Sequence, residues 1–207
     1  MAEPTLRWVT AAVTGVLEEA RERGFLGPGP VAAHVEHAWP LVTVLPSTGT
    51  VIDLGSGGGV PALALAVARP DLDWVLVESQ HRRARGLIEA VEALGLSVRA
   101  VVLVERAEET GRGPYRGGAA AVVARSFGPP AVTAECAAPL LAAGATCWVA
   151  EPPSPSLERW PEDGLAELGL TRRLERVGGW VGLDRVAPCP DRYPRRVGIP
   201  AKRPLFG

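Results

Sequence analysis

The sequence predicts an α/β domain built around a mostly parallel, doubly wound sheet, and three observations support this prediction. Short apolar segments alternate with segments of helical periodicity between residues 50 and 150, a pattern typical of strands joined by crossover helices. A glycine-rich turn follows the first of these apolar segments. Polar residues then recur directly after several predicted strands, at the sheet edge where ligands bind in folds of this kind.

The composition limits the classes of protein to which the chain can belong. The chain has 207 residues, of which 47% are hydrophobic, enough for one domain with a substantial core and too many for a disordered chain. No apolar run approaches the ~18 residues of a membrane span. The N-terminus, with Glu3 and Pro4, lacks a basic-then-apolar signal pattern. We therefore expect a cytoplasmic protein without a membrane partner.

Charge and cysteine content indicate which partners and metal sites to expect. The net charge is −1 and the only lysine is Lys202, so the positive charge is almost all arginine. This balance does not favour broad coating of nucleic acid, but local arginine patches suit phosphate contacts. Cys136, Cys147 and Cys189 are odd in number and far apart, which offers neither a disulfide framework nor a zinc spacing. We expect no metal site.

The beginning of the chain predicts a helical cap. Thr5 to Arg23 carries apolar residues at helical spacing. Gly27 to Pro30 is a break, and Val31 to Val44 is a second helical candidate. We expect residues 1–46 to form the cap of a ligand-binding domain that spans residues 47–207, with both parts in one compact unit.

The stretch from Thr50 to Pro61 predicts a strand, a glycine turn and the start of a helix. Thr50 to Leu54 is apolar and β-branched apart from Asp53, and the sequence then continues as D-x-G-x-G-x-G up to Gly59. Glycines at alternate positions allow positive φ and let the main chain approach a ligand closely. Pro61 suits the first turn of a helix, because its missing N–H costs nothing there. No Gly-Lys-Ser/Thr follows, so this is not a P-loop.

A second acidic residue follows the next predicted strand. Asp73 to Val77 is that strand, and Glu78 lies 19 residues after Gly59. A carboxylate about 20 residues beyond such a loop is placed to accept hydrogen bonds from both ribose hydroxyls of a nucleoside. Asp53 and the glycine spacing resemble the first motif of S-adenosylmethionine-dependent methyltransferases. Dinucleotide-dependent enzymes are the alternative for this stretch.

The remaining segments continue the alternation of strands and helices. Ser79 is expected to cap the next helix. Arg82, Arg83 and Arg85 lie at the start of that helix, where they form either a solvated face or a basic edge toward a substrate. The other expected elements are strands at 98–104, 120–124 and 146–150, helices at 130–141 and 157–168, and an antiparallel hairpin at 170–177 and 180–187.

Five segments carry a family resemblance from about residue 31 to the end of the chain. They are the loop from Asp53 to Pro61, Glu78-Ser79 followed by Arg82-Arg83, Arg106-Ala107-Glu108-Glu109, Ala124-Arg125-Ser126-Phe127, and the ending from Asp191 to Leu205. Together they resemble the glucose-inhibited division protein B family, which are guanine-N7 methyltransferases of small-subunit ribosomal RNA. The resemblance implies a Rossmann-like class I methyltransferase with S-adenosylmethionine as cofactor. It also implies ribosomal RNA or the small ribosomal subunit as partner.

The resemblance assigns roles to individual residues. Glu78 would take the ribose hydroxyls, and Ala107 and Glu108 would flank the adenine. Arg125 would lie at the active-site mouth as a positioning residue. The cofactor-binding set implied is Asp53, Gly55, Ser56, Gly57, Gly59, Val60, Glu78, Ser79, Ala107, Glu108 and Arg125. The substrate-binding set implied is His34, Phe127, Arg195, Arg196, Lys202 and Arg203, the last four on a tail expected to form the last hairpin of the sheet.

The expected reaction needs little from the protein beyond geometry. Guanine N7 carries a free lone pair and needs no prior deprotonation, so catalysis can rest on positioning. This fits the absence of a convincing pair of general base and orienting residue in the sequence. His34 and His37 are the histidines of the predicted cap.

Two departures from the family pattern concern the substrate half. The segment from Ala33 to Ala38 stands where the family usually has R-H-x-x-D-S, and it keeps only His34 of that motif. Glu151-Pro152 stands where Lys-Gly is usual, which reverses a charge near the expected RNA entrance. These departures motivate a second hypothesis, a methyltransferase of the same fold acting on another RNA or a small molecule. A cofactor-binding assembly protein without turnover is a third hypothesis, and a nicotinamide-dependent dehydrogenase is a fourth.

Overall fold

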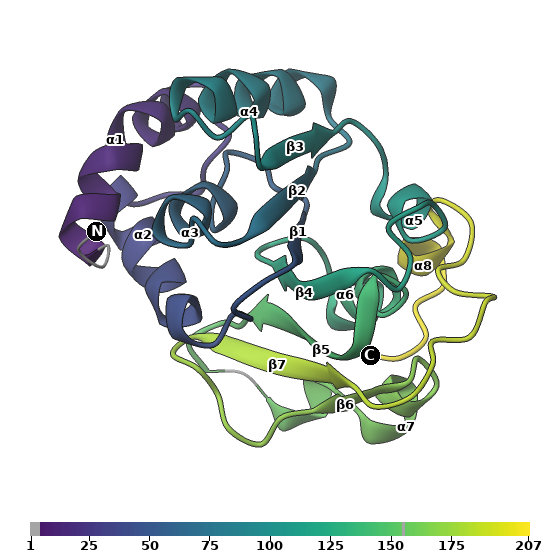
Figure 1. The fold of residues 1–207 in the computed structure, drawn as a ribbon. Coiled ribbons are helices and arrows are strands. Elements are labelled where there is room, and N and C mark those ends of the chain that lie inside the picture. Colours follow the sequence, from purple (N-terminus) through teal and green to yellow (C-terminus); the bar gives the residue numbers. More distant parts are fainter. Residues whose placement is uncertain (1–4, 155) are drawn as a thin grey trace.

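The computed structural model, which describes residues 5–154 and 156–207, contains a seven-stranded sheet with the order β3-β2-β1-β4-β5-β7-β6 (Figure 1). The first five strands run parallel, and β7 pairs antiparallel with β5 and β6. This confirms the mostly parallel sheet and its late hairpin. The strands are β1 Thr50–Leu54, β2 Asp73–Val77, β3 Ala100–Leu103, β4 Ala119–Ala124, β5 Leu141–Ala150, β6 Leu170–Arg172 and β7 Trp180–Arg185.

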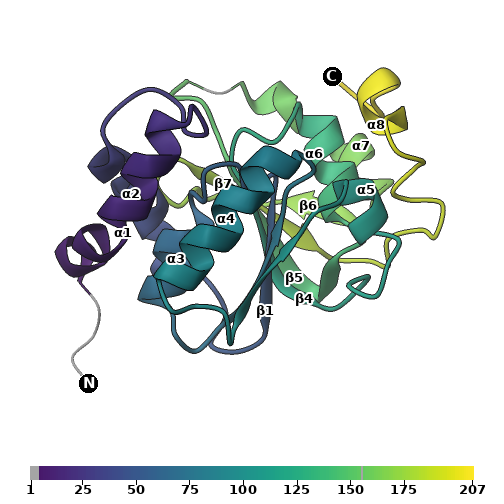
Figure 2. The ribbon, with the colours of Figure 1, turned by 90° about the horizontal axis from the view of Figure 1, so that it is seen from above.

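Helices cover both faces of the sheet, as Figure 2 shows, and alternation along the strands supplies each face with apolar side chains. Val51 and Leu76 belong to the core beneath the first helices, whereas Ile52 and Val75 belong to the core on the opposite face. The doubly wound arrangement is therefore confirmed. The helices are α1 Leu6–Glu22, α2 Val31–Ala38, α3 Ala62–Ala68, α4 His81–Ala93, α5 Ala107–Thr110, α6 Pro130–Ala137, α7 Glu162–Ala166 and α8 Ile199–Lys202, with 3-10 turns η1 Trp39–Thr43 and η2 Leu157–Arg159.

The segment before β1 is helical and packs on the sheet domain. Thr5 caps α1 by accepting a hydrogen bond from the Trp8 N–H at 3.3 Å. The α-helix predicted for residues 31–44 in fact ends at Ala38 and continues as the 3-10 turn η1. Pro40 explains the change, because proline lacks an N–H and its ring clashes with the preceding turn of an α-helix. The boundary between cap and domain at residue 46 stays a prediction.

The C-terminal part departs most from the sequence prediction. β5 begins at Leu141 and not at residue 146, but its register with β4 shifts between the pairs Ala119–Leu141 and Ala121–Thr146, and Gly144, with a φ of 74°, lies within this irregularity. The helix predicted for residues 130–141 correspondingly ends at Ala137. The predicted hairpin of the tail is wrong: after β7 the tail forms loops and the short helix α8. Its prolines lack the N–H groups that a strand ladder needs.

The tail is fastened to the domain by arginine side chains. Arg116 donates hydrogen bonds to the backbone carbonyls of Tyr193 at 2.6 Å, and of Cys189 and Pro190 at 3.2 Å each. The tail consequently lies beside α5 and α6 (Figure 1). Within the described part of the chain, no helix combines the length and the apolar character needed to cross a membrane.

Candidate active site

The candidate site lies where the strand order reverses, at the carboxyl ends of β1 and β4. The loop after β1 needs its glycines. Gly55, Gly57 and Gly59 have φ values of 68°, 55° and 96°, which side chains rarely allow. A Cβ on Gly59 would lie 2.3 Å from Leu63 Cδ1, and one on Gly55 would lie 2.8 Å from Phe127 Cδ2. The alternate glycines therefore allow both the turn of this loop and its close packing against Leu63 and Phe127.

Glu78 joins this loop to the following helix. Its side chain is 5% exposed and accepts hydrogen bonds from the Gly57 N–H at 3.0 Å and the Gln80 N–H at 2.8 Å. The predicted capping role of Ser79 is wrong, because Gln80 occupies the N-cap and no side chain caps it. The Glu78 carboxylate instead accepts one of the four N–H groups that the start of α4 leaves without a helical partner.

Two cavities meet at the glycine loop. The first, of about 280 Å³, is lined by Glu78, Ser79, Ala107, Glu108 and Phe127, among others. The second, of about 330 Å³, is lined by Ser56, Gly57, Val60, His34 and Arg125, among others. Gly55, Arg83 and Ser126 line both cavities. The predicted cofactor residues thus line one extended cleft, except Asp53 and Gly59, which line neither cavity.

Asp53 is the buried acid below the loop. It is 1% exposed, and its Oδ2 atom has no hydrogen-bond partner among the described residues. Burial raises the pKa of Asp53 to about 7, and the Glu78 carboxylate adds to this, while Ser56 and Arg125 partly offset it. An orphaned acceptor beside a glycine cradle fits a ligand that brings donors or positive charge, as S-adenosylmethionine does.

A hydrogen bond links the cap to the end of β4. Arg125 Nη2 lies 2.7 Å from His34 Nδ1, and His34 Nε2 lies 3.3 Å from the Gly27 carbonyl oxygen. Because a guanidinium only donates, His34 accepts at Nδ1 and donates to Gly27 from Nε2. Burial and the Arg125 charge lower the pKa of His34, which favours this neutral form. The cap histidine therefore orients the arginine.

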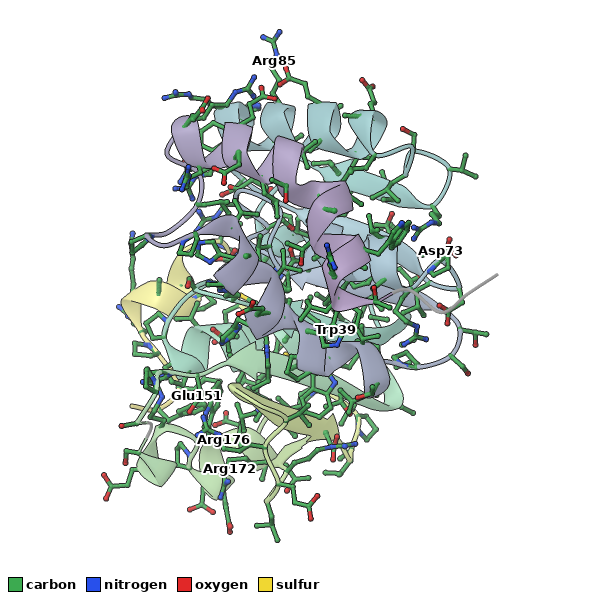
Figure 3. The ribbon with its side chains drawn as sticks, turned by 90° about the vertical axis from the view of Figure 1, so that its left-hand side faces the viewer. Trp39, Asp73, Arg85, Glu151, Arg172 and Arg176 are labelled. Carbon is green, nitrogen blue, oxygen red and sulfur yellow. The ribbon has the colours of Figure 1, made fainter. Side chains whose placement is uncertain are left out.

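A third cavity, of about 390 Å³, lies beyond Arg125 and Ser126 and is lined by Phe127, Glu151 and Trp160, among others. The expected negative charge of Glu151 at the RNA entrance needs correction. The Glu151 side chain is 3% exposed and pairs with Arg159 at 3.3 Å and Arg176 at 3.5 Å. Figure 3 shows Glu151 beside Arg176 at one end of the molecule. Two arginines from later segments balance the charge, which removes this argument for a different substrate.

The predicted phosphate-binding residues of the tail divide into two groups. Arg195 is committed to Glu135, a fully buried acid of α6, which accepts from Arg195 Nη2 at 2.6 Å and from Nε at 2.8 Å. This ion pair occupies the Arg195 guanidinium, and the contact of Arg195 with phosphate stays a prediction. Arg196, Lys202 and Arg203 are exposed. Their contact with RNA stays a prediction.

The tail also reaches the first cavity. Glu108 Oε1 accepts a hydrogen bond from the Gly198 N–H at 2.9 Å, and Ala201 lines the cavity wall. Glu108 is 4% exposed. It therefore holds the tail against the cavity in addition to lining it.

Some residues of the cleft escaped the sequence prediction. Phe25 and Leu26, between α1 and α2, line the second cavity, and a Cβ on Gly58 would lie 2.6 Å from Leu26 Cδ2. Their apolar pair directly before the Gly-Pro break was the available signal. Arg83 lines both cofactor cavities, which favours the basic-edge interpretation for this residue. Arg85, in contrast, points into solvent (Figure 3) and pairs with Glu89.

The strand order, the glycine loop and the acid at the next strand end define a class I methyltransferase, whose methyl donor is S-adenosylmethionine. A solved SAM-dependent O-methyltransferase from Thermotoga maritima has the same fold, with a TM-score of 0.57 and 14% identity over 84% of this chain and 72% of that one. Among the described residues, no group of three or more His, Cys, Asp or Glu could hold a metal ion.

Sequence comparisons identify the family. The family model of rRNA small subunit methyltransferase G, GidB, matches residues 31–151. A ribosomal RNA small subunit methyltransferase G from a Synechococcus species is 38% identical over 81% of this chain and 76% of its own length. One from Rubrobacter xylanophilus is 36% identical over 81% and 69%. The chain belongs to the rRNA small subunit methyltransferase G family, as the sequence motifs predicted, and is a methyltransferase.

Proposed function

We propose that the protein transfers a methyl group from S-adenosylmethionine to N7 of a guanine in small-subunit (16S) ribosomal RNA. The observation that carries the proposal is one extended cleft at the glycine loop that meets a separate cavity at Arg125 and Ser126. The extended cleft is suited to a cofactor, and the separate cavity is suited to a base. Membership of an rRNA methyltransferase family supports RNA as the substrate.

The cofactor would lie across the first two cavities. Glu78 would bind the ribose hydroxyls, with its carboxylate already oriented by Gly57 and Gln80. Ala107 and Glu108 would flank the adenine, in the cavity whose wall the tail completes. Gly55 and Val60 would line the methionine part.

The chemistry then rests on alignment. The cofactor supplies a methyl group on a positively charged sulfur, which guanine N7 can attack without losing a proton. Arg125 would hold the base at the mouth of the cleft, and neutral His34 would hold Arg125. Alignment of two reactants can supply several kcal/mol of the barrier, about 7–11 in well-oriented cases, so no general base is required.

The partner and the location follow from this substrate. Exposed Arg196, Lys202 and Arg203 would meet RNA phosphates near the cofactor end of the cleft. We propose the small ribosomal subunit or its free RNA as the partner, and the cytoplasm as the location.

The test is a transfer assay with labelled S-adenosylmethionine. Small subunits and free rRNA from a strain that lacks the corresponding methyltransferase would be incubated with the protein, and nuclease mapping would locate the product. We expect one 7-methylguanosine, and we expect Arg125→Ala to lower kcat at saturating cofactor about 100-fold. Label in a metabolite extract and none in RNA would refute the RNA proposal. A normal rate for Arg125→Ala would refute the arginine's role.

A further inference from the structure

The cavity of about 390 Å³ beyond Arg125 contains a buried acid with an incompletely used carboxylate. Glu151 Oε1 accepts hydrogen bonds from Trp160 Nε1 at 3.1 Å and from Arg159 Nε at 3.3 Å. Among the described residues, Glu151 Oε2 has only the longer ion-pair contact of 3.5 Å with Arg176 Nη2. An ionised carboxylate has room for about four hydrogen bonds. Oε2 therefore keeps acceptor capacity at the cavity wall.

The surroundings explain how the charge is tolerated in this place. A buried carboxylate is costly unless it is paired, and two guanidinium groups pair it, each about one-third exposed, with Arg159 also lining the cavity. Phe127 and Trp160 line the same cavity and add aromatic surface, on which unstacked bases commonly rest. The volume lies within the range of ~300–1,000 Å³ that is usual for small-molecule sites.

We propose that this cavity holds the target guanine and that Glu151 selects it, by accepting hydrogen bonds from the N1–H and the 2-amino group. The proposal rests on the proposed function and adds the residue that recognises the base. Guanine is the RNA base with two adjacent donors on its Watson–Crick edge, whereas adenine, cytosine and uracil each place an acceptor among those positions. A carboxylate therefore favours guanine and repels the others.

The position of the cavity agrees with the required direction of the base. N7 lies on the opposite side of guanine from the 2-amino group. With the Watson–Crick edge at Glu151, N7 points toward Arg125 and Ser126, which line both this cavity and the cofactor cleft. The base must leave its stack to enter, as in other enzymes that modify bases.

The experiment compares guanosine at the target position with inosine, the nucleoside whose base lacks the 2-amino group and keeps N7. Small-subunit rRNA carrying either base at the mapped position would be prepared by splinted ligation of a synthetic fragment. We expect wild-type kcat/KM to be about 10-fold lower on inosine, because one hydrogen bond to a charged group is lost. Glu151→Gln, which replaces one carboxylate oxygen with a donor, should lower kcat/KM on guanine by about 10-fold or more and reduce the discrimination against inosine to less than about 3-fold.

Two controls separate the possible failures. Glu158→Gln removes the same charge from an exposed residue of η2 and should behave as wild type. The cofactor Kd of Glu151→Gln should also equal that of wild type. Equal wild-type rates on guanine and inosine, which require no variant, would overturn the role of Glu151 and leave the proposed function standing. Absence of any guanine methylation by wild type would overturn both.

Discussion

The two halves of the sheet hold their functional residues in different ways. On the β1–β3 side, Glu78 contacts Gly57 and Gln80, which lie 21 and 2 positions away in the chain. On the β4–β7 side and in the tail, Glu135 contacts Arg195 over 60 positions and Arg116 contacts the Tyr193 carbonyl over 77. The glycine loop and Glu78 of the cofactor half are thus assembled within one crossover unit, whereas the other half depends on contacts that form only when distant segments meet.

The largest expected loss of stability comes from a substitution in the glycine loop, on the β1–β3 side of the sheet. Gly59→Ala combines a positive φ with a Cβ 2.3 Å from Leu63 Cδ1, so either the loop or the buried Leu63 side chain has to shift. Strain and overlap together should cost about 3–5 kcal/mol of unfolding free energy and abolish cofactor binding. Denaturant unfolding and calorimetry with S-adenosylhomocysteine would measure both.

The matched control is another glycine-to-alanine change. Gly15 lies within α1, and a Cβ added to it would meet no atom within 4 Å, so Gly15→Ala should stabilise the protein by about 0.5–1 kcal/mol through helix propensity. If Gly59→Ala bound cofactor with normal affinity, the glycine cradle would not be what holds the ligand.

This contrast also explains which features the sequence could predict. The span of β1 and the site of Glu78 followed from spacing, because a βαβ unit fixes where its second strand ends. Nothing local signals that Arg195 meets Glu135 or that Arg176 meets Glu151, because those contacts depend on how the tail and the last hairpin pack. The family ending suggested a hairpin in the tail, but prolines exclude it there.

The next largest expected loss of stability comes from a substitution in the tail, which long-range contacts hold in place. Arg195→Ala would leave the fully buried Glu135 without its guanidinium partner, and breaking such a pair costs about 3 kcal/mol or more. The tail should loosen, and with it the wall that Ala201 gives to the cofactor cavity. Denaturant unfolding would report the loss of stability, and tail proteolysis would report the loosening.

Arg196→Ala is the control for Arg195, since it changes the adjacent, exposed arginine. Its unfolding free energy should stay within about 0.5 kcal/mol of wild type. Equal stability of the two variants would show that the pair with Glu135 does not fasten the tail.

A smaller effect depends on pH and tests the acid beneath the loop. The pKa of Asp53 is raised by burial to about 7, so its contribution to stability is present at acidic pH and is lost as pH rises through 7. Asp53→Asn removes this titration. Relative to the variant, wild type without cofactor should lose about 2 kcal/mol between pH 5 and pH 8.5. Thermal unfolding of both proteins at the two pH values would measure it, and a constant difference would contradict the raised pKa.

The smallest expected change in stability comes from a substitution of Ser126, just after the end of β4. Ser126, with a φ of 54°, is the one non-glycine residue with a positive φ among those described, and it lines all three cavities. A non-glycine residue in this region stores roughly 1 kcal/mol of strain. Ser126→Gly should therefore raise stability by about 0.5 kcal/mol after the entropy cost of glycine, whereas Ser79→Gly, at a loop serine without positive φ, should lower it.

Ser126→Gly should lower activity although it raises stability. A strained residue between the cofactor cleft and the third cavity fixes how the two cavities are oriented, and glycine would relax that orientation. We expect kcat to fall a few-fold while the cofactor Kd stays unchanged. A gain in stability with unchanged kcat would mean that the strain at the end of β4 only closes the turn, and that the two halves of the cleft are aligned by Arg125 and His34 alone.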